Sequence, residues 1–235
     1  MIDYHSHILP GIDDGSQRVE DSIEMLRRLQ AQGVDTVFFT PHFYPNQISL
    51  SKFLLRRGAS YSKLCSALPD EPLPRFRLGA EVLYYRGISH LDGLNRLCAE
   101  GTNLLLLEMP FSHWGEYEIR EICELAAAGE VTVLLAHVER YLAFQSDKIW
   151  DRLLRSGVLF QCNAEFFLAP IVRKKAVQML RRDWIYVLGT DTHNLTTRAP
   201  HMDSALHYIG KELGEDYRSF FEHRSDDFLE YLSHR

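Results

Sequence analysis

The sequence predicts an α/β protein whose parallel sheet is barrel-like. Short apolar runs alternate with longer amphipathic stretches along most of the 235 residues. The runs are apolar almost throughout and are bounded by polar residues or glycine, which is typical of parallel strands buried on both faces. Seven such strand–helix units favour a sheet that closes on itself, although an open sheet fits the same alternation. A single barrel is often this long, so we expect residues 1–235 to form one domain.

The expected strands are the short apolar runs, which are, in chain order, residues 2–7, 34–40, 76–82, 104–109, 131–136, 158–163 and 185–189. The stretches between them predict helices over residues 21–32, 51–68, 88–100, 116–128, 148–156, 170–182 and 202–213. In the first of these, Ile23, Leu26 and Leu29 recur at helical spacing, and Gly33 suits the position just after a helix. Residues 220–235 are expected to form a polar closing helix or a frayed tail.

The composition argues against several classes of function. A formal net charge of −6 and a pI near 6.0 disfavour a protein that binds nucleic acid through its phosphates. No run of about 18 apolar residues is present, so we expect no membrane span. The first residues do not show the basic and apolar regions of a secretory signal, and a cytoplasmic location is expected.

The cysteines form no recognisable metal or redox motif. Cys65, Cys98, Cys123 and Cys162 are scattered without a C-x-x-C pair, so we expect small, reduced core side chains. None is followed by arginine six positions later, which excludes the Cys-x5-Arg loop of cysteine-dependent phosphatases. Catalysis through a cysteine nucleophile of that kind is therefore not expected.

The first expected strand carries two histidines at its end. Because residues two apart in a strand point to the same face, His5 and His7 can bind one metal ion together. The turn that follows is rich in glycine and aspartate and can bring Asp14 back toward them. From these residues alone, a buried histidine pair that is satisfied by hydrogen bonds is nearly as good an explanation as a metal site.

A histidine or an acid stands at the end of most of the other expected strands, and these residues are His42, Glu81, Glu108, His137, Asp191 and His193. Parallel strands bring their C-terminal ends to one face, where barrels place their chemistry. Singly, each has a structural explanation, such as an ion pair for Glu81 or a helix-start acid at Asp191. Together, carboxylates and imidazoles this close are costly unless cations lie between them. Nitrogen and oxygen donors without a thiolate favour manganese, iron, zinc or magnesium over a sulfur-bound structural zinc.

The same residues resemble the polymerase and histidinol phosphatase (PHP) superfamily. Residues 5–15, HSHILPGIDDG, together with LGAE at 78–81 and HVERY at 137–141, are similar to a narrower group. That group is the bacterial manganese-dependent tyrosine-protein phosphatases of capsule and exopolysaccharide operons. The resemblance covers residues 1 to about 198. It departs at Val138, where the family motif has proline, and in a shortened stretch after His193.

The resemblance implies a distorted (β/α)7 barrel of the PHP type with three metal ions, expected to be Mn²⁺ with iron, zinc or magnesium as alternatives. His5, His7, Glu81 and Asp191 would hold the first ion. Glu81, as a bridge, would hold the second together with Glu108 and His137. Asp14, His42 and His193 would hold the third. The implied substrate is the phosphotyrosine tail of a membrane-associated tyrosine autokinase that controls capsular or exopolysaccharide synthesis.

Such a site predicts phosphoester hydrolysis without a covalent intermediate. Two ions about 3.5–4 Å apart can hold a hydroxide that attacks phosphorus in line. We expect Arg140 and the third ion to neutralise the equatorial oxygens, because the planar fork of arginine fits phosphate. Arg198 resembles a second family arginine, or is a solvated charge. Tyrosine, with a pKa of about 10, is a good leaving group, so no general acid is assigned. Glu139 is explained at least as well by an ion pair.

Several residues could line the entrance, although packing or solvated charge explains them better: Phe43, Tyr44, Lys52, Arg56, Arg57, Trp114, Phe166 and Phe167. The main alternative function is a small-molecule phosphatase of the histidinol phosphate type on the same site. A nuclease for DNA ends is disfavoured by the negative charge. A non-catalytic metal-binding domain is disfavoured by the complete set of donors. A homo-oligomer is compatible with the sequence.

Overall fold

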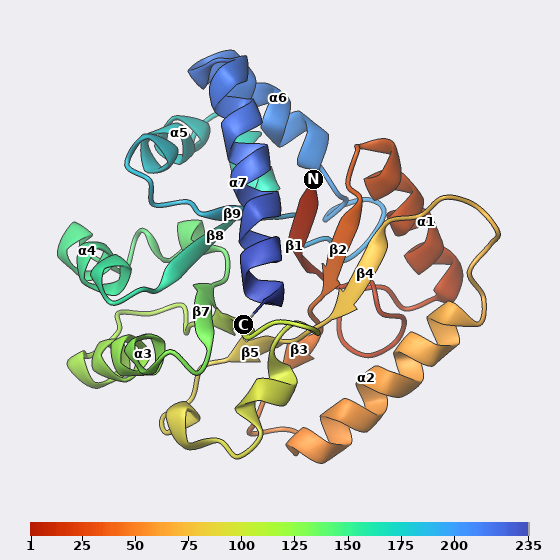
Figure 1. The fold of residues 1–235 in the computed structure, drawn as a ribbon, viewed down its shortest axis with the longest axis horizontal. Helices are drawn as coiled ribbons and strands as arrows, with labels where there is room; N and C mark the ends of the chain where they lie inside the picture. Colours follow the sequence, from red (N-terminus) through yellow and green to blue (C-terminus); the bar gives the residue numbers. More distant parts are fainter. Residues whose placement is uncertain (235) are drawn as a thin grey trace.

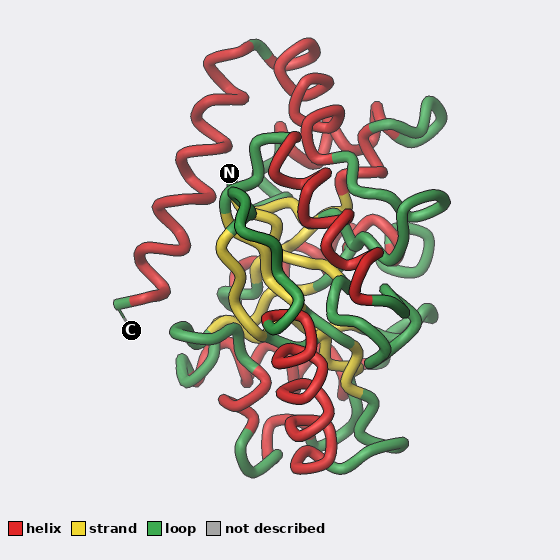
Figure 2. Tube along the Cα trace, turned by 90° about the vertical axis from the view of Figure 1, so that its right-hand side faces the viewer, coloured by secondary structure: helices red, strands yellow, loops and turns green. Residues whose placement is uncertain are grey.

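The computed structural model describes residues 1–234 and shows a curled parallel sheet surrounded by helices (Figures 1 and 2). The strands are β1 (Ile2–Ser6), β2 (Thr36–Phe39), β3 (His42–Phe43), β4 (Arg75–Leu78), β5 (Glu81–Leu83), β6 (Leu104–Glu108), β7 (Thr132–Leu135), β8 (Leu159–Asn163) and β9 (Val187–Gly189). All the strand pairings among these residues are parallel. The predicted α/β class with a parallel sheet is thus confirmed.

The strands form one curled surface made of two hydrogen-bonded groups. One group has the order β1-β2-β4 and the other has the order β3-β5-β6-β7-β8-β9. The residues after β9 pair with the end of β1. The Asp191 amide donates to the His5 carbonyl (2.7 Å), and the His7 amide donates to the Thr192 carbonyl (2.9 Å). The last strand therefore lies beside the first, and the ends of both face the same place.

The predicted strand 76–82 is broken into two, and the predicted strand 34–40 is followed by a short strand, β3, that was not predicted. β2 and β3 are separated by Thr40 and Pro41, and β4 and β5 are separated by Gly79 and Ala80. Proline has no amide hydrogen to give to a ladder, so a break at Pro41 is expected once the strand lies inside a sheet. After the breaks, β3 pairs with β5 in a register that sets His42 opposite Glu81. The irregularity thus brings two predicted ligands together.

The helices are α1 (Val19–Ala31), α2 (Leu50–Cys65), α3 (Glu116–Ala128), α4 (Asp147–Arg155), α5 (Arg173–Arg181), α6 (Met202–Leu213) and α7 (Glu215–Ser233). Short 3-10 turns are η1 (Ile88–His90), η2 (Leu94–Leu97), η3 (Val138–Tyr141) and η4 (Ala164–Phe167). The predicted bounds of α3 and α6 are reproduced, and α1 is followed, as predicted, by Gly33 at a φ of 82°. The other predicted helices are confirmed with shifted ends, apart from one.

The helix predicted over residues 88–100 is wrong. The chain there forms only the short turns η1 and η2, and Gly87 and Gly93 precede them with φ of 89° and 82°. This left-handed backbone conformation suits glycine and cannot continue a right-handed helix. The apolar spacing that predicted a helix instead places Leu94 and Leu97 in the core.

The C-terminal stretch is a well-packed helix and not a frayed tail. α7 lies along one side of the sheet, in front in Figure 1 and at the left in Figure 2. Phe228, Leu229 and Leu232 of α7 join the apolar cluster that contains Ile2 and Tyr4 of β1. Of the two expectations, the closing helix is confirmed and the frayed tail is wrong, because a helix with many charged residues still offers one apolar side to the sheet.

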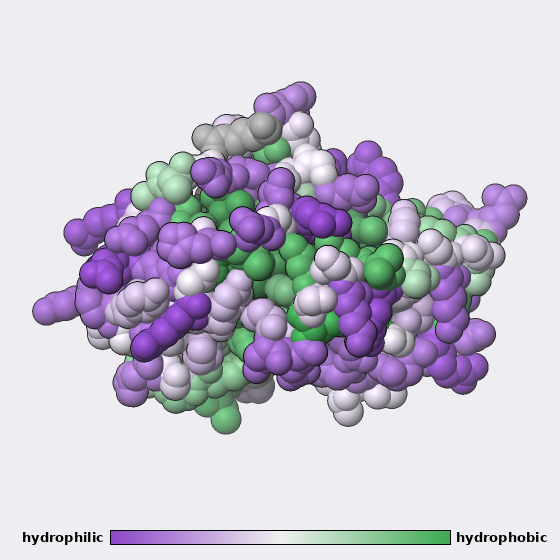
Figure 3. Space-filling model, turned by 90° about the horizontal axis from the view of Figure 1, so that it is seen from below, coloured by the Kyte–Doolittle hydropathy of each residue, from purple (hydrophilic) through white to green (hydrophobic). Residues whose placement is uncertain are grey.

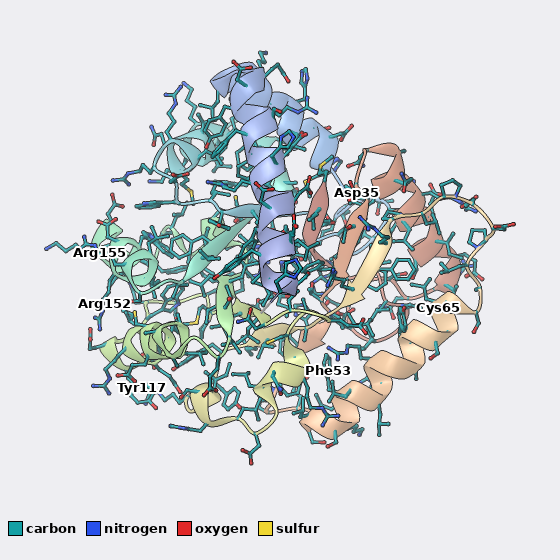
Figure 4. The ribbon with its side chains drawn as sticks, viewed as in Figure 1. Asp35, Phe53, Cys65, Tyr117, Arg152 and Arg155 are labelled. Atoms are coloured by element: carbon teal, nitrogen blue, oxygen red, sulfur yellow. The ribbon has the colours of Figure 1, made fainter. Side chains whose placement is uncertain are left out.

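The outer surface carries charged side chains without a predicted role. Figure 3 shows a mostly hydrophilic face with hydrophobic side chains near its middle. Figure 4 shows Tyr117 on α3, with Arg152 and Arg155 on α4, at the outer edge of the molecule. Arg152 pairs with Glu116 at 2.7 Å. None of the described helices combines the length and apolar composition that a membrane crossing requires.

Candidate metal centre

The structure gathers all the predicted metal ligands in one place, near the C-terminal ends of β1, β6, β7 and β9 and at the first residues of β3 and β5. His5, His42, Glu81 and Glu108 lie on β1, β3, β5 and β6, while the others lie in the segments that follow β1, β7 and β9. All but two of these side chains are buried. The exceptions are His42, which is half-buried, and Asp14, whose side chain is 65% exposed and reaches the cluster from the loop after β1. The cluster is therefore largely enclosed and opens on the side of Asp14.

The first predicted ligand set is compact. Nε2 of His5 and Nε2 of His7 lie 3.1 Å apart, and each is 3.2 Å from Oε2 of Glu81. Oδ1 of Asp191 lies 3.6 Å from the His5 nitrogen and 3.5 Å from the His7 nitrogen. Four donor atoms from three separate parts of the chain thus surround one small volume.

The second and third predicted sets are also brought together, and His42 joins them. Nε2 of His137 lies 2.8 Å from Oε1 of Glu81 and 3.7 Å from Oε1 of Glu108. Oδ1 of Asp14 lies 3.3 Å from Nε2 of His42 and 3.4 Å from Nε2 of His193. His42 also approaches Oε2 of Glu81 through Nδ1, at 2.9 Å. His42 therefore lies between the Glu81–Glu108 pair and the Asp14 side of the cluster.

Three overlapping groups of donors have atoms within 4.8 Å of one another, and each could hold an ion: His7, Asp14, His42 and His193; His5, His7 and Glu81; His42, Glu81 and Glu108. The groups contain no cysteine. They share most members with the predicted sets, but they add His7 to the Asp14 group and His42 to the Glu108 group. Two predicted ligands, Asp191 and His137, belong to none of the three groups. These nitrogen and oxygen donors suit divalent ions such as manganese, iron, zinc or magnesium.

The hydrogen-bond pattern of the histidines also fits bound cations. Nδ1 of His7 bonds to Oδ2 of Asp13 (2.8 Å), and Nδ1 of His5 bonds to Oε1 of Gln161 (3.1 Å). Since both acceptors are oxygens, each Nδ1 is the donor, so that in the neutral rings each Nε2 is an acceptor available to a cation. The two Nε2 atoms lie 3.1 Å apart, a contact that either a shared proton or a cation beside them relieves.

Buried polar atoms without hydrogen bonds are concentrated in the same place. They are Nδ1 of His42, Oε2 of Glu81, Nδ1 of His137 and Nε2 of His193, and among the described residues only Nε of Arg224 lies elsewhere. Nδ1 of His42 and Oε2 of Glu81 are close to each other, but their orientation does not allow a hydrogen bond. Unpaired buried groups are costly, and metal coordination would satisfy most of these.

The carboxyl groups respond to the imidazoles around them. Burial alone would raise the pKa of Glu81, but His5, His137 and His42 together hold it well below the usual value. Burial, and then the charge of Glu81, raises the pKa of Glu108 to about 7. The imidazoles therefore offset only part of the negative charge of the crowded carboxylates, as expected of a site that binds cations.

Both predicted phosphate-binding arginines reach the cluster. Arg140, in η3, forms an ion pair with Oδ2 of Asp191. Nη2 of Arg198 lies 2.7 Å from the same oxygen, and its Nη1 lies 3.9 Å from Oδ2 of Asp14. The two side chains are 35% and 33% exposed, so both guanidinium groups remain open to an incoming anion.

Three residues that orient the ligands were missed by the sequence analysis. Asp13 accepts from His7, as above, and also from the backbone amide of His42 (3.1 Å). Gln161 accepts from His5 and from the amide of His137 (2.7 Å). Asn163 donates to Asp191 (2.8 Å). The available signals were the first aspartate of the DD pair at 13–14 and two polar residues on alternate positions of an otherwise apolar strand.

The backbone is strained at two ligands. His137 and Asp191 have φ of 34° and 52°, a region that residues with side chains rarely adopt. Nearby, a Cβ on Gly189 would come within 2.5 Å of the Cβ of His5. Only glycine allows β9 to approach β1 this closely. The strained conformations aim the two ligands and recur at functional sites of other proteins.

The predicted entrance residues divide into core and rim. Phe43, Trp114 and Phe167 are buried in the main apolar core, and Phe166 packs against it from a half-buried position. Arg57 donates to the carbonyl of Gly79 (2.6 Å) and so supports the break before β5. Packing thus explains the aromatic residues, whereas Arg57 is not the solvated charge that was expected.

The remaining entrance candidates lie beside the metal ligands. Tyr44 stacks on His42, with ring centroids 4.9 Å apart and planes at 20°. With Lys52 and Arg56 it lines a pocket of about 420 Å³ that also contains Asp14. An aromatic residue that the sequence analysis did not single out, Phe111, stacks on His137 on another part of the rim.

Comparisons with known proteins find similarity over nearly the whole chain. A family model described as capsular polysaccharide synthesis, CpsB/CapC, matches residues 1–228. The tyrosine-protein phosphatase YwqE of Bacillus subtilis is 30% identical over 223 residues, covering 92% of this chain and 86% of that protein. The tyrosine-protein phosphatase CpsB of Streptococcus pneumoniae is 28% identical over 235 residues, covering 91% of each chain.

Solved structures are similar over nearly the whole chain. One, from work on YwqE and CpsB described as metal-dependent tyrosine phosphatases, has a TM-score of 0.81 at 26% identity and covers 95% of this chain and 92% of that chain. The histidinol phosphate phosphatase of Lactococcus lactis has a TM-score of 0.56 at 16% identity, covering 92% of this chain and 93% of that chain. The second likeness concerns the fold alone.

Proposed function

Because this chain belongs to the capsular polysaccharide synthesis CpsB/CapC family, we propose that it is a metal-dependent protein-tyrosine phosphatase. The observation that carries the proposal is the cluster of histidines and carboxylates with two arginines beside it, in a chain 30% identical to a tyrosine-protein phosphatase. The reaction is hydrolysis of a phosphate monoester. It serves capsular or exopolysaccharide synthesis.

The cofactor is a set of three divalent ions, with Mn²⁺ as the expected metal. His5, His7, Glu81 and Asp191 hold the first; Glu81, Glu108 and His137 the second; Asp14, His42 and His193 the third. When bound, such ions supply a nucleophile at neutral pH and offset the charge of the phosphate. The close donor distances, the unpaired buried atoms and the absence of cysteine from the donor groups support this assignment.

The protein's own residues position the ester and stabilise the charge that develops on it. Arg140 and Arg198 bind the phosphate oxygens, because each presents a planar fork of donors and is partly exposed. Their shared partner Asp191 holds both guanidinium groups in place before the ester arrives. Asp13 and Gln161 fix the tautomers of His7 and His5, so that each Nε2 faces the cluster. The phenolate of tyrosine leaves without obligatory help from a protein acid.

The substrate is the phosphotyrosine tail of a membrane-associated tyrosine autokinase, and the enzyme acts on it in the cytoplasm. The family's connection with capsule synthesis supports this choice of partner. The fold is a distorted (β/α)7 barrel of the PHP type formed by residues 1–235 as a single domain. The hydrogen bonds that join the segment after β9 to β1 support a closed sheet.

The test is phosphate release from a phosphotyrosine peptide and from histidinol phosphate, measured side by side. Each reaction is run after chelation and again after Mn²⁺ is restored. We expect release from the peptide that depends on Mn²⁺, with little release from histidinol phosphate. The reverse preference would keep the metal site but assign the protein to small-molecule phosphatases. No release from either substrate would overturn the proposal.

A further inference from the structure

The loop after β6 presents an aromatic ring to solvent at the edge of the polar cluster. Phe111 is 51% exposed, whereas Met109 and Trp114 of the same loop are buried. Large exposed apolar side chains are few among the described residues. This one is distinguished by its place, because its ring stacks on the predicted metal ligand His137.

The loop holds this ring in a fixed place. The Met109 amide donates to Oη of Tyr141 (2.9 Å), and Nε1 of Trp114 donates to the carbonyl of Pro110 (3.0 Å). Nε2 of Gln145 donates to the carbonyl of Ser112 (2.8 Å). These bonds secure the residues on both sides of Phe111. The ring is thus pre-organised, and little conformational entropy is lost when something binds to it.

The ring lies directly against the candidate metal centre. Its centroid is 6.0 Å from that of His137, with planes at 20°, and 5.5 Å from that of Tyr141. His137 in turn contacts Glu81 at 2.8 Å. Arg140 lies three residues after His137 in the same turn and points to the cluster. Phe111 and the turn that carries Arg140 thus both adjoin His137, and this shared neighbour is the placement on which the proposal rests.

We propose that Phe111 binds the phenyl ring of phosphotyrosine and makes the site prefer aryl over alkyl phosphates. The proposal rests on the tyrosine phosphatase function proposed above and names the residue that determines its specificity. Two aromatic rings in offset or edge-to-face contact are more stable by about 0.5–1.5 kcal/mol than their burial alone explains, equivalent to about 2- to 10-fold in binding. An alkyl phosphate has no ring to make this contact.

The alternative is that Phe111 only shields His137 from water. If the ring only shields His137, its removal should weaken metal binding. The binding of every anionic ligand should then weaken by the same factor. Direct contact predicts a loss confined to ligands that carry a ring. The two roles can be separated by ligands that are not turned over, since these report binding without the chemical step.

The experiment measures direct binding of phenylphosphonate and of methylphosphonate to the Mn²⁺-loaded protein by calorimetric titration. We expect wild type to bind the phenyl compound more tightly, and Phe111→Ala to reduce that preference about 2- to 10-fold with methylphosphonate binding and metal content unchanged. Phe111→Tyr keeps a ring and should keep the preference. Phe220→Ala is the matched control, because Phe220 is 57% exposed on α7 and should leave the preference unchanged.

An unchanged preference in Phe111→Ala would overturn the proposal. So would an equal loss for both phosphonates accompanied by loss of metal, which is the result of shielding. If Phe111→Ala does not fold, Phe111→Leu retains apolar volume without a flat face and should show the same selective loss. A wild type that binds phenylphosphonate preferentially but releases no phosphate from phosphotyrosine would contradict the proposed function and leave the ring contact intact.

Discussion

The same strands build a polar site at one end of the sheet and an apolar core at the other. On β6, the alternate residues Leu104 and Leu106 belong to the cluster beneath α7, whereas the next, Glu108, faces the metal centre. On β8, Leu159 packs against that apolar cluster, and Gln161 two residues later bonds to two metal-centre residues. Side chains on one face of a strand thus change from apolar to polar along its length.

The difference shows where stability and chemistry are separated. Apolar burial is non-directional and stabilises the fold roughly in proportion to area. Buried polar groups each need a partner, and at the metal centre several have none in the protein. Substitutions at the polar end should therefore change metal binding and turnover, while substitutions at the α7 end should change stability and leave the chemistry intact. Substitutions at each end of the sheet can test this separation.

Glu81→Gln should have the largest effect, because Glu81 contacts His5, His7, His42 and His137 at the polar end. Glutamine keeps the shape but removes the charge. Replacement of residues that merely support a ligand costs about 10- to 100-fold, so loss of a shared ligand should cost more than about 100-fold in turnover. Metal content after dialysis and Mn²⁺-dependent phosphate release are the measurements.

The control for Glu81→Gln is Glu124→Gln, since Glu124 is exposed on α3. It should retain both metal and activity. A Glu81→Gln protein with a full complement of metal and normal turnover would show that the two ends of the sheet do not differ as argued.

Arg140→Ala should reduce turnover about 100- to 1,000-fold, the usual cost of removing a donor to transition-state charge. Metal content should stay close to that of wild type, because Arg140 contacts the cluster through Asp191 without being a donor to a cation. Steady-state kinetics and metal analysis of the same preparation test both statements. Arg140→Lys keeps the charge without the fork and should restore only part of the rate. Unchanged hydrolysis in Arg140→Ala would remove this residue from the mechanism.

Asp13→Asn should weaken Mn²⁺ binding about 10- to 100-fold, because the charged acceptor that orients His7 is lost. Activity should return at higher Mn²⁺ concentration, since the ligands themselves remain. The measurement is the Mn²⁺ concentration that gives half-maximal phosphate release. A midpoint equal to that of wild type would mean that His7 is oriented without Asp13.

The polar end was largely predictable from the sequence, and its supporting bonds were not. His42, Glu81 and Asp191 were visible because each follows a short apolar run, and parallel strands bring such ends together. The role of Asp13 depends on its hydrogen bond to His7, and the role of Gln161 depends on its hydrogen bond to His5. His5 lies far from Gln161 in the chain. Spacing along one segment contains no information about such a pair.

The apolar end and the rim were predicted less well for the same reason. In α7, Phe228 and Leu232 stand among charged residues, and their partners are strand residues such as Tyr4 near the other terminus. On the rim, Trp114 was considered because of its type, yet it is buried, while Phe111 three positions earlier is exposed. Tertiary packing decides which of two neighbouring aromatic residues enters the core.

Phe228→Ala should have the smallest effect on the reaction and a large one on stability. Phe228 is buried between Tyr4 and Tyr186, with ring centroids 6.0 and 4.8 Å away. Removing a buried phenyl ring costs about 3–5 kcal/mol in the free energy of unfolding. Urea denaturation at 25 °C should show this loss, while kcat, KM and metal content of the folded protein stay near wild type.

Phe220→Ala is again the matched control, because Phe220 is exposed on the same helix. It should change the free energy of unfolding by no more than about 0.5 kcal/mol. A Phe228→Ala protein that remained folded but lost its metal would show that α7 and the metal centre are coupled through the strands. The apolar end would then set the geometry of the site as well as the stability of the fold, and the separation of the two ends would fail.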